Sequence, residues 1–180
     1  MIFFTSDLHF GHDKEFIWGA RGYKSVEEMN EVQVARWNEQ VEPDDFVYVL
    51  GDLFLGSPDN IKYVKRLNGH LFIVMGNHDT KSRIDQLALL KNVWQIYQHA
   101  TDITLDGQKL WLCHYPTVVD MPKGKDPALA CVFGHTHQSD TWGFEGRPNM
   151  VNVGIDYWKY PVPYDTVLDI IRKGYYDRPN

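Results

Sequence analysis

Short apolar runs recur along the chain, and small or polar turn residues follow each of them at once. Runs of this length, bounded by turn signals, are typical of strands buried on both faces. The six runs are Ile2 to Thr5, Phe46 to Leu50, Leu71 to Met75, Leu110 to Cys113, Ala130 to Phe133 and Met150 to Val153.

Helix signals separate the early runs. Ser25 followed by Glu28 is a capping box, and Ser57-Pro58 supplies an N-cap and first helical position for a second helix reaching Leu67. A third helix is expected over about Arg83 to Leu90. The first half thus alternates strands and helices, the order that builds a largely parallel sheet with right-handed crossovers.

The second half is richer in strands. Asp106-Gly107 between two apolar stretches predicts a tight hairpin. A loop is expected over Tyr157 to Pro163, and then Asp165 is expected to cap a last helix that ends near Gly174. These patterns together predict an α/β fold.

Composition is that of a folded chain, which we expect to form a single domain over residues 1–180. Hydrophobic residues make up 43% and charged residues 23% of the sequence, which excludes a disordered tail as its main content.

Net charge and cysteine content restrict the expected partners and cellular location of the protein. The formal net charge of −6 argues against broad binding of duplex DNA. No apolar run approaches the roughly 20 residues that span a bilayer, and Met1 leads directly into a strand rather than a signal peptide. Cys113 and Cys131 lie in apolar runs, as expected for a reduced compartment, so a cytoplasmic location away from membranes is predicted.

Side chains of the types that can bind metal ions follow the apolar runs. Because the carboxyl ends of parallel strands share one edge of a sheet, these residues are expected to converge there. Taken singly, Asp52 and Asn77 also suit helix caps or turns, and a lone buried histidine is usually a core residue. The motifs are Asp7-Leu8-His9, Gly51-Asp52, Gly76-Asn77-His78-Asp79, Cys113-His114 and Gly134-His135-Thr136-His137.

In this order the five motifs resemble the signature of the calcineurin-like metallophosphoesterase superfamily, and the sequence is similar to its short stand-alone bacterial and phage members. The resemblance implies a two-sheet αββα sandwich. It also implies a dinuclear metal centre in which a hydroxide between the metals attacks the phosphoester.

Matched to the family pattern, Asp52 would bridge the two metals, and Asn77 would serve as both a ligand and a substrate contact. Oxygen and imidazole ligands without thiolate suit Mn, Fe, Zn, Co or Ni, as divalent or mixed-valence pairs, and we favour Mn. The remaining implied ligands are Asp7, His9 and His137 for the first ion and His114 and His135 for the second.

Three further residues receive roles near the metals. By resemblance His78 projects towards the substrate and donates a proton to the leaving oxygen, with Asp79 as its orienting partner. His12 lies three residues beyond His9, and either contacts the substrate phosphate or is an ordinary surface histidine.

Departures from the family pattern restrict the substrate. Asp52 is followed by Leu53-Phe54-Leu55-Gly56, whereas protein phosphatases continue this motif with an acidic residue and a phosphate-binding arginine. Leu55 stands where purple acid phosphatases have a tyrosine ligand. We therefore expect a small phosphodiester substrate, such as a nucleotide or cyclic nucleotide. The alternatives are a phosphomonoesterase, a single-strand nuclease, and a non-catalytic scaffold of the same fold.

Loop residues supply further hypotheses on specificity. Basic loop residues such as Arg21 and Arg83 either add local positive charge or are simply solvated. Aromatic residues in the late loops either stack on a base or pack in the core; they are Trp142, Phe144, Tyr157 and Trp158. The motifs carry no information on oligomeric state.

Overall fold

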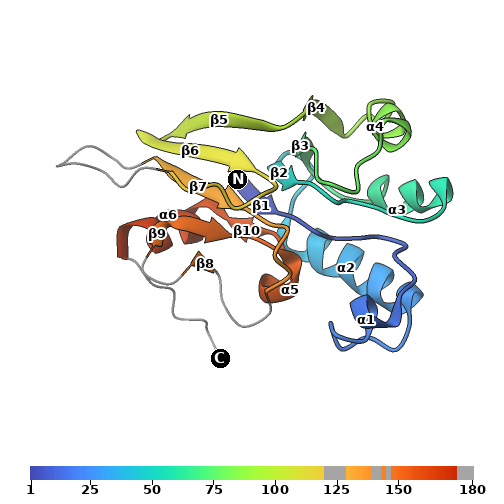
Figure 1. The fold of residues 1–180 in the computed structure, drawn as a ribbon. Coiled ribbons are helices and arrows are strands. Elements are labelled where there is room, and N and C mark those ends of the chain that lie inside the picture. Colours follow the sequence, from blue (N-terminus) through green and yellow to red (C-terminus); the bar gives the residue numbers. More distant parts are fainter. Residues whose placement is uncertain (120–128, 139–142, 145–146, 174–180) are drawn as a thin grey trace.

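The computed structural model describes residues 1–119, 129–138, 143–144 and 147–173. Two five-stranded sheets lie against each other, and helices flank them (Figure 1). The expected α/β class with two sheets is confirmed, with a largely parallel first half and a strand-rich second half.

The first sheet has the order β10-β1-β2-β3-β4. β1 to β4 run parallel, as the alternation of strands and helices predicts, and only β10 pairs antiparallel. The sequence did not predict β4, an edge strand whose side chains are exposed or half-buried and therefore lack a continuous apolar run. The bounds are β1 Ile2–Thr5, β2 Phe46–Leu50, β3 His70–Val74, β4 Val93–Tyr97 and β10 Val162–Pro163.

The second sheet has the order β5-β6-β7-β9-β8, with β6, β7 and β9 parallel and the outer strands antiparallel. The expected hairpin joins β5 to β6, with Asp106 and Gly107 at positive φ as its turn requires. The bounds are β5 Ala100–Leu105, β6 Gln108–Cys113, β7 Ala130–Phe133, β8 Gly143–Phe144 and β9 Arg147–Asn152.

The capping box is confirmed, because the Ser25 side chain accepts a hydrogen bond from the backbone N–H of Glu28 at the start of α2. The helix bounds are α1 Glu15–Trp18, α2 Val26–Gln40, η1 Pro58–Asn60, α3 Ile61–Val64, α4 Lys81–Leu87, α5 Ile155–Trp158 and α6 Tyr164–Lys173.

Four predicted helix boundaries differ from the structure. The helix expected to reach Leu67 begins as η1 and ends as α3 at Val64. α4 lies slightly before the expected range, and Asp165 falls within the first turn of α6 instead of capping it. The short helix α5 replaces the start of the loop expected from Tyr157, because Gly154 opens it and Lys159, in the left-handed conformation, closes it. The expected end of the last helix, Gly174, lies outside the described residues.

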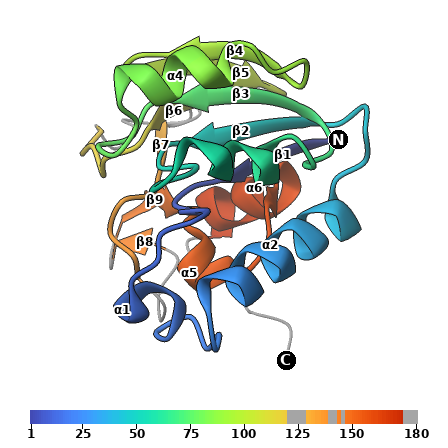
Figure 2. The ribbon, with the colours of Figure 1, turned by 90° about the vertical axis from the view of Figure 1, so that its right-hand side faces the viewer.

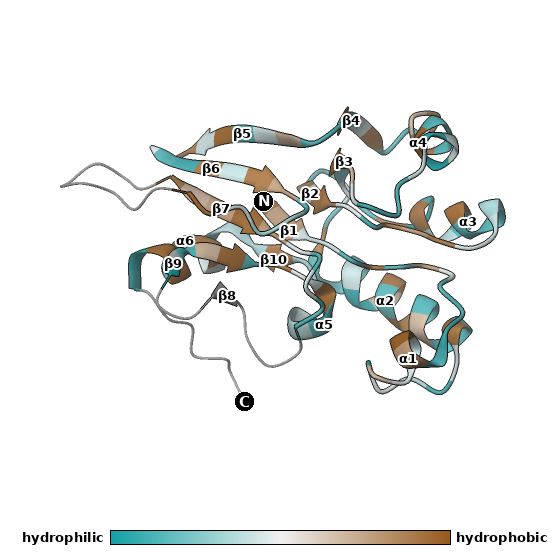
Figure 3. Cartoon of the chain, in the orientation of Figure 1, coloured by the Kyte–Doolittle hydropathy of each residue, from teal (hydrophilic) through white to brown (hydrophobic). Residues whose placement is uncertain are grey.

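Apolar side chains form one cluster on each face of the first sheet. On the outer face, residues of α2, α3 and α4 cover β1, β2 and β3 (Figure 2). On the inner face, α6 and both sheets contribute to a second cluster, and hydrophobic colouring follows the strands that meet there (Figure 3). A smaller cluster that includes Cys131, Phe133 and Met150 lies on β7 and β9. This packing fixes the strands whose ends carry the motifs.

Among the described helices, none combines the length and apolar character needed to cross a membrane.

The outer cluster can be tested at Ile73, which is fully buried in β3. Ile73→Ala should lower the free energy of unfolding by about 2–5 kcal/mol, because it leaves a cavity under the helices. Urea unfolding followed by circular dichroism measures this change. The control Leu89→Ala, at a residue 84% exposed, should change the free energy by less than about 0.5 kcal/mol. Equal losses in the two variants would contradict the assigned packing.

Candidate metal centre

The predicted ligands lie together at one edge of the two sheets. Asp7, Asp52 and Asn77 follow β1, β2 and β3 of the first sheet, whereas His114 and His135 follow β6 and β7 of the second. Parallel strands deliver their carboxyl ends to the same edge, which is why motifs distant in sequence meet.

The backbone is left-handed at five of these residues. Asp and His adopt this conformation more readily than most side chains, but it remains uncommon outside glycine. Such residues cluster at functional sites, where the surrounding structure holds them in place. The five φ angles are 60° at Asp7, 55° at His9, 56° at Asp52, 68° at His135 and 50° at His137.

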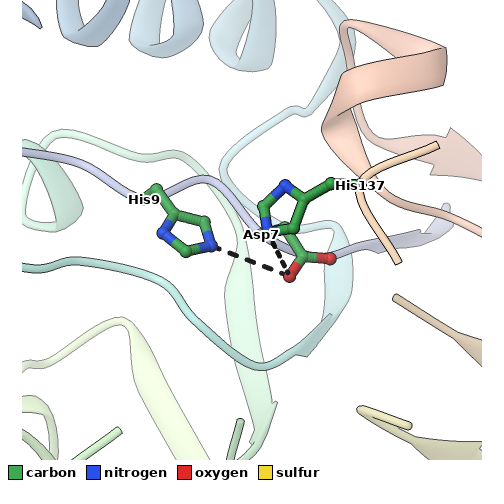
Figure 4. Close-up of side chains that lie close together, drawn as sticks. All are labelled: Asp7, His9 and His137. Carbon is green, nitrogen blue, oxygen red and sulfur yellow. Dashed lines mark ion pairs between the residues drawn. The ribbon is translucent and has the colours of Figure 1, made fainter. Parts of the chain in front are cut away.

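The two carboxylate oxygens of Asp7 have different surroundings. Oδ2 accepts hydrogen bonds from Ser6 Oγ at 2.6 Å and from the backbone N–H of His135 at 2.8 Å. Oδ1 is buried without a hydrogen-bond partner, 3.8 Å from His9 Nε2 and 3.8 Å from His137 Nε2 (Figure 4). His9 Nε2 is likewise buried and unpartnered. Unsatisfied buried polar atoms are costly, and a cation between them would satisfy both.

Glycine keeps this arrangement open at Gly134. A Cβ at this position would overlap Ser6 Oγ and Asp7 Oδ2, so only glycine lets the end of β7 approach Asp7 this closely.

Asp52 lies between the two halves of the cluster. Its Oδ1 accepts the backbone N–H of His78 at 2.8 Å. Its Oδ2 is 3.7 Å from His9 Nε2 and 3.5 Å from His114 Nε2, so one oxygen faces both the Asp7 side and the His114 side. Asp52 is therefore the carboxylate that borders both groups of donor atoms.

The second half of the cluster consists of Asn77, His114 and His135. Asn77 Oδ1 is 2.8 Å from His114 Nε2 and 2.9 Å from His135 Nδ1. The Leu50 carbonyl, which can only accept, lies 2.7 Å from His114 Nδ1, so this nitrogen carries the proton in the neutral ring. The lone pair of His114 Nε2 then faces the Asp52 carboxylate, an arrangement that a cation would stabilise.

The donor atoms are spaced for metal binding. Those of Asp7, His9 and His137 lie within 4.8 Å of one another, and so do those of Asp7, Asp52 and His114. Oxygen and imidazole donors of this kind suit first-row transition ions. The residues present therefore fit a centre for such ions.

Burial and neighbouring charges determine whether Asp7, His9 and His135 are protonated. Burial raises the pKa of Asp7, but His9 and the charges of His114 and His137 outweigh it and hold this pKa below its ordinary value. Burial lowers the pKa of His9 and of His135. Asp7 is thus ionised and both imidazoles are neutral, the forms that bind metal ions.

His78 borders the centre and is partly exposed to solvent. Its side chain is 44% exposed, and its Nε2 is 3.9 Å from Asp52 Oδ2. Among the described residues, the hydrogen bonds of the Asp79 carboxylate go to backbone amides and not to this imidazole. Asp79 Oδ2 accepts the backbone N–H groups of Asp52 and Gly76, at 2.9 and 2.8 Å, and so ties the turn after β2 to the turn after β3.

His12 is part of the same histidine cluster, because its Nδ1 is 3.1 Å from His9 Nδ1. Burial and the neighbouring His9 and His78 lower its pKa to about 4. His12 is therefore a neutral group beside the centre.

Sequence reasoning missed or misplaced several residues. Arg21, expected on a charged loop, is buried and pairs with Asp156, a residue that no motif indicated. Tyr157 and Trp158 are buried, so the hypothesis that they stack on a base is wrong, and Trp142 lies outside the described residues. Tyr115, beside the motif residue His114, is exposed, and the sequence pattern assigned it no role.

Comparisons with known proteins agree with this geometry. Residues 1–158 match the calcineurin-like phosphoesterase superfamily domain. The chain is 28% identical to the Gene 66 protein of Mycobacterium phage D29 over 94% of this chain and 95% of that protein. It is 30% identical to an uncharacterised protein, MJ1445, of Methanocaldococcus jannaschii over 96% and 92%.

A crystal structure of a protein of unknown function, AQ665 from Aquifex aeolicus, has the same fold, with a TM-score of 0.67 at 24% identity over 90% of this chain and 94% of that chain. With the family domain matched over residues 1–158 and the motif residues gathered at one edge of the sheets, this chain belongs to the calcineurin-like phosphoesterase superfamily.

Proposed function

We propose that this protein is a metal-dependent phosphoesterase that hydrolyses a small phosphodiester such as a nucleotide or cyclic nucleotide. The observation that carries the proposal is the convergence of the motif side chains around two buried atoms without partners, Asp7 Oδ1 and His9 Nε2.

In this proposal the Asp52 carboxylate, which faces both His9 and His114, would hold both of two metal ions. When bound, such ions neutralise phosphoryl oxygens, lower the pKa of a water and stabilise charge that develops during in-line displacement. The other ligands are Asp7, His9 and His137 on one side and Asn77, His114 and His135 on the other.

His78 is the proposed proton donor to the leaving oxygen. Its imidazole is half-exposed beside Asp52, within reach of a substrate bound at the centre, and its backbone N–H donates to the Asp52 carboxylate at 2.8 Å. His12, neutral and next to His9, is proposed to hydrogen-bond the substrate phosphate.

Two exposed aromatic rings favour a substrate that carries a flat apolar group. Tyr115 is 47% exposed, and its ring centroid lies 4.7 Å from that of His135. Phe16 is 70% exposed, and its ring lies edge-on to His12 at 6.0 Å. Because aromatic rings stack on nucleobases, this placement supports a nucleotide ester rather than an alkyl ester.

Replacing His78 tests the chemistry. His78→Ala should bind Mn²⁺ as the unchanged protein does, yet lower kcat by about 100- to 10,000-fold, because it removes the proton donor. Isothermal titration calorimetry gives the metal stoichiometry, and hydrolysis of bis-p-nitrophenyl phosphate gives kcat. His70→Ala, at the opposite end of β3, is the matched histidine control and should keep full activity.

Asp52→Asn is the metal-site control and should lose both metal binding and turnover. Full activity of His78→Ala in saturating Mn²⁺ would refute the role of His78. Unchanged protein that binds Mn²⁺ but hydrolyses neither diesters nor p-nitrophenyl phosphate would favour the non-catalytic alternative. Hydrolysis of the monoester alone would favour a phosphomonoesterase, and affinity for oligonucleotides that falls with salt would favour a nuclease.

Tyr115 tests the substrate class. Tyr115→Ala should lower kcat/KM for the thymidine ester of p-nitrophenyl phosphate by about 10-fold, since stacking on one base contributes roughly 1–3 kcal/mol. It should leave the ratio unchanged for methyl p-nitrophenyl phosphate, which has the same leaving group without the base. Tyr115→Phe keeps the ring and should match the unchanged protein, as should Trp94→Ala, an exposed ring on β4. Equal losses on both substrates would contradict base stacking.

A further inference from the structure

Arg21 and Asp156 form a buried ion pair next to the candidate centre. The two residues are 135 positions apart, in the segment before α2 and in α5. Arg21 Nε donates to Asp156 Oδ1 and Nη2 donates to Oδ2, both at 2.9 Å, so the pair is bidentate. The Arg21 side chain is only 3% exposed.

The same guanidinium also binds the backbone that carries the first motif. Nη2 donates to the carbonyl of Asp7 at 2.7 Å, and Nη1 donates to the carbonyl of Leu8 at 2.9 Å. Both carbonyls belong to the turn in which Asp7 and His9 are left-handed. Arg21 therefore restrains this strained turn through its backbone carbonyls, and leaves the side-chain donor atoms of Asp7 and His9 unengaged.

Asp156 binds the third residue of the same half-centre. Its Oδ2 is 3.0 Å from Nδ1 of His137. Because a carboxylate can only accept, His137 Nδ1 carries a proton, and in the neutral ring the lone pair lies on Nε2, 3.8 Å from Asp7 Oδ1. A carboxylate behind a ligating histidine fixes its tautomer and ring orientation and raises its basicity.

We infer that Arg21 and Asp156 are positioning residues that jointly set Asp7, His9 and His137 for metal binding. The inference rests on the proposed metal-dependent function. A buried ion pair by itself is weak grounds for stability, because desolvation of both charges offsets their attraction. Apart from a long contact of Arg21 Nη1 with Met29 Sδ at 3.6 Å, however, the other hydrogen bonds of the pair go to the turn of Asp7 and to the ring of His137, so its main effect falls on the centre.

Mn²⁺ titration of metal-free protein by calorimetry tests this role without reference to activity. Asp156→Asn should weaken the affinity for Mn²⁺ by about 10- to 100-fold, the loss typical when a partner of a ligating histidine is removed. In a His137→Ala background the same substitution should have a much smaller effect, since the ring that Asp156 orients is gone. A merely structural role would weaken binding equally in both backgrounds.

A second variant separates positioning from folding. Arg21→Met with Asp156→Leu removes both buried charges together, which often leaves stability nearly unchanged. Thermal unfolding of the metal-free form should then stay close to that of the unchanged protein, while Mn²⁺ affinity still falls. The matched control is Arg66→Met with Glu31→Leu, which removes a bidentate pair of the same kind, at 2.7 and 2.8 Å, on the surface. This control should bind Mn²⁺ normally.

The outcomes distinguish the inference from the proposed function. Unchanged protein that binds no Mn²⁺ would overturn the proposed function itself. Normal binding by the unchanged protein, together with normal binding by Asp156→Asn and by the double variant, would overturn only the positioning role. Loss of the folded state in every Arg21 or Asp156 variant would show a purely structural pair and would overturn the inference too.

Discussion

The candidate centre depends on the different hydrogen bonding of the two Asp7 carboxylate oxygens. Oδ2 is saturated by the Ser6 hydroxyl, which follows β1 of the first sheet, and by the His135 amide, which follows β7 of the second. Through the His135 amide this oxygen joins the end of the first sheet to the end of the second, as does the hydrogen bond between His114 Nδ1 and the Leu50 carbonyl. Because Oδ2 is spent on structure, Oδ1 is left buried and unpartnered beside His9 and His137. The hydrogen bond from the His135 amide to Asp7 Oδ2 thus joins the two sheets and leaves Oδ1 free to bind a cation.

Holding the donors this close requires unfavourable backbone conformations. A non-glycine residue in the left-handed region costs about 1 kcal/mol or more, and Asp7, His9, Asp52, His135 and His137 all adopt it. The turns persist because their neighbours restrain them: the Asp7 amide bonds the carbonyl of Gly51, the His9 amide bonds that of Asp52, and Asp79 bonds two amides of the adjoining turns. Strain at this edge is therefore offset by hydrogen bonds between turns and by the apolar clusters beneath them.

The sequence predicts the centre better than it predicts the structure that supports it. Asp7, Asp52 and His114 could be placed because each follows an apolar run, and parallel topology brings such strand ends together. Arg21 and Asp156 could not, because they lie outside any strand end and meet across 135 positions only through tertiary packing. Tyr157 and Trp158 looked like loop residues, yet α5 turns them into the core. β4 was missed because an exposed edge strand lacks the apolar run that marks a buried one.

The negative charge of the buried carboxylates at the candidate centre indicates that metal binding and substrate binding are linked in the proposed function. Asp7 and Asp52 place two carboxylates, both almost fully buried, where the proposed phosphate would lie. The guanidinium of Arg21 cannot offset them at the phosphate, since it is itself buried and engaged by Asp156 and by the carbonyls of Asp7 and Leu8. His9, His12 and His135 are neutral because burial lowers their pKa values. In the proposed function, these carboxylates would repel a phosphodiester anion in the metal-free protein, so bound cations would contribute to substrate affinity as well as to the chemical step.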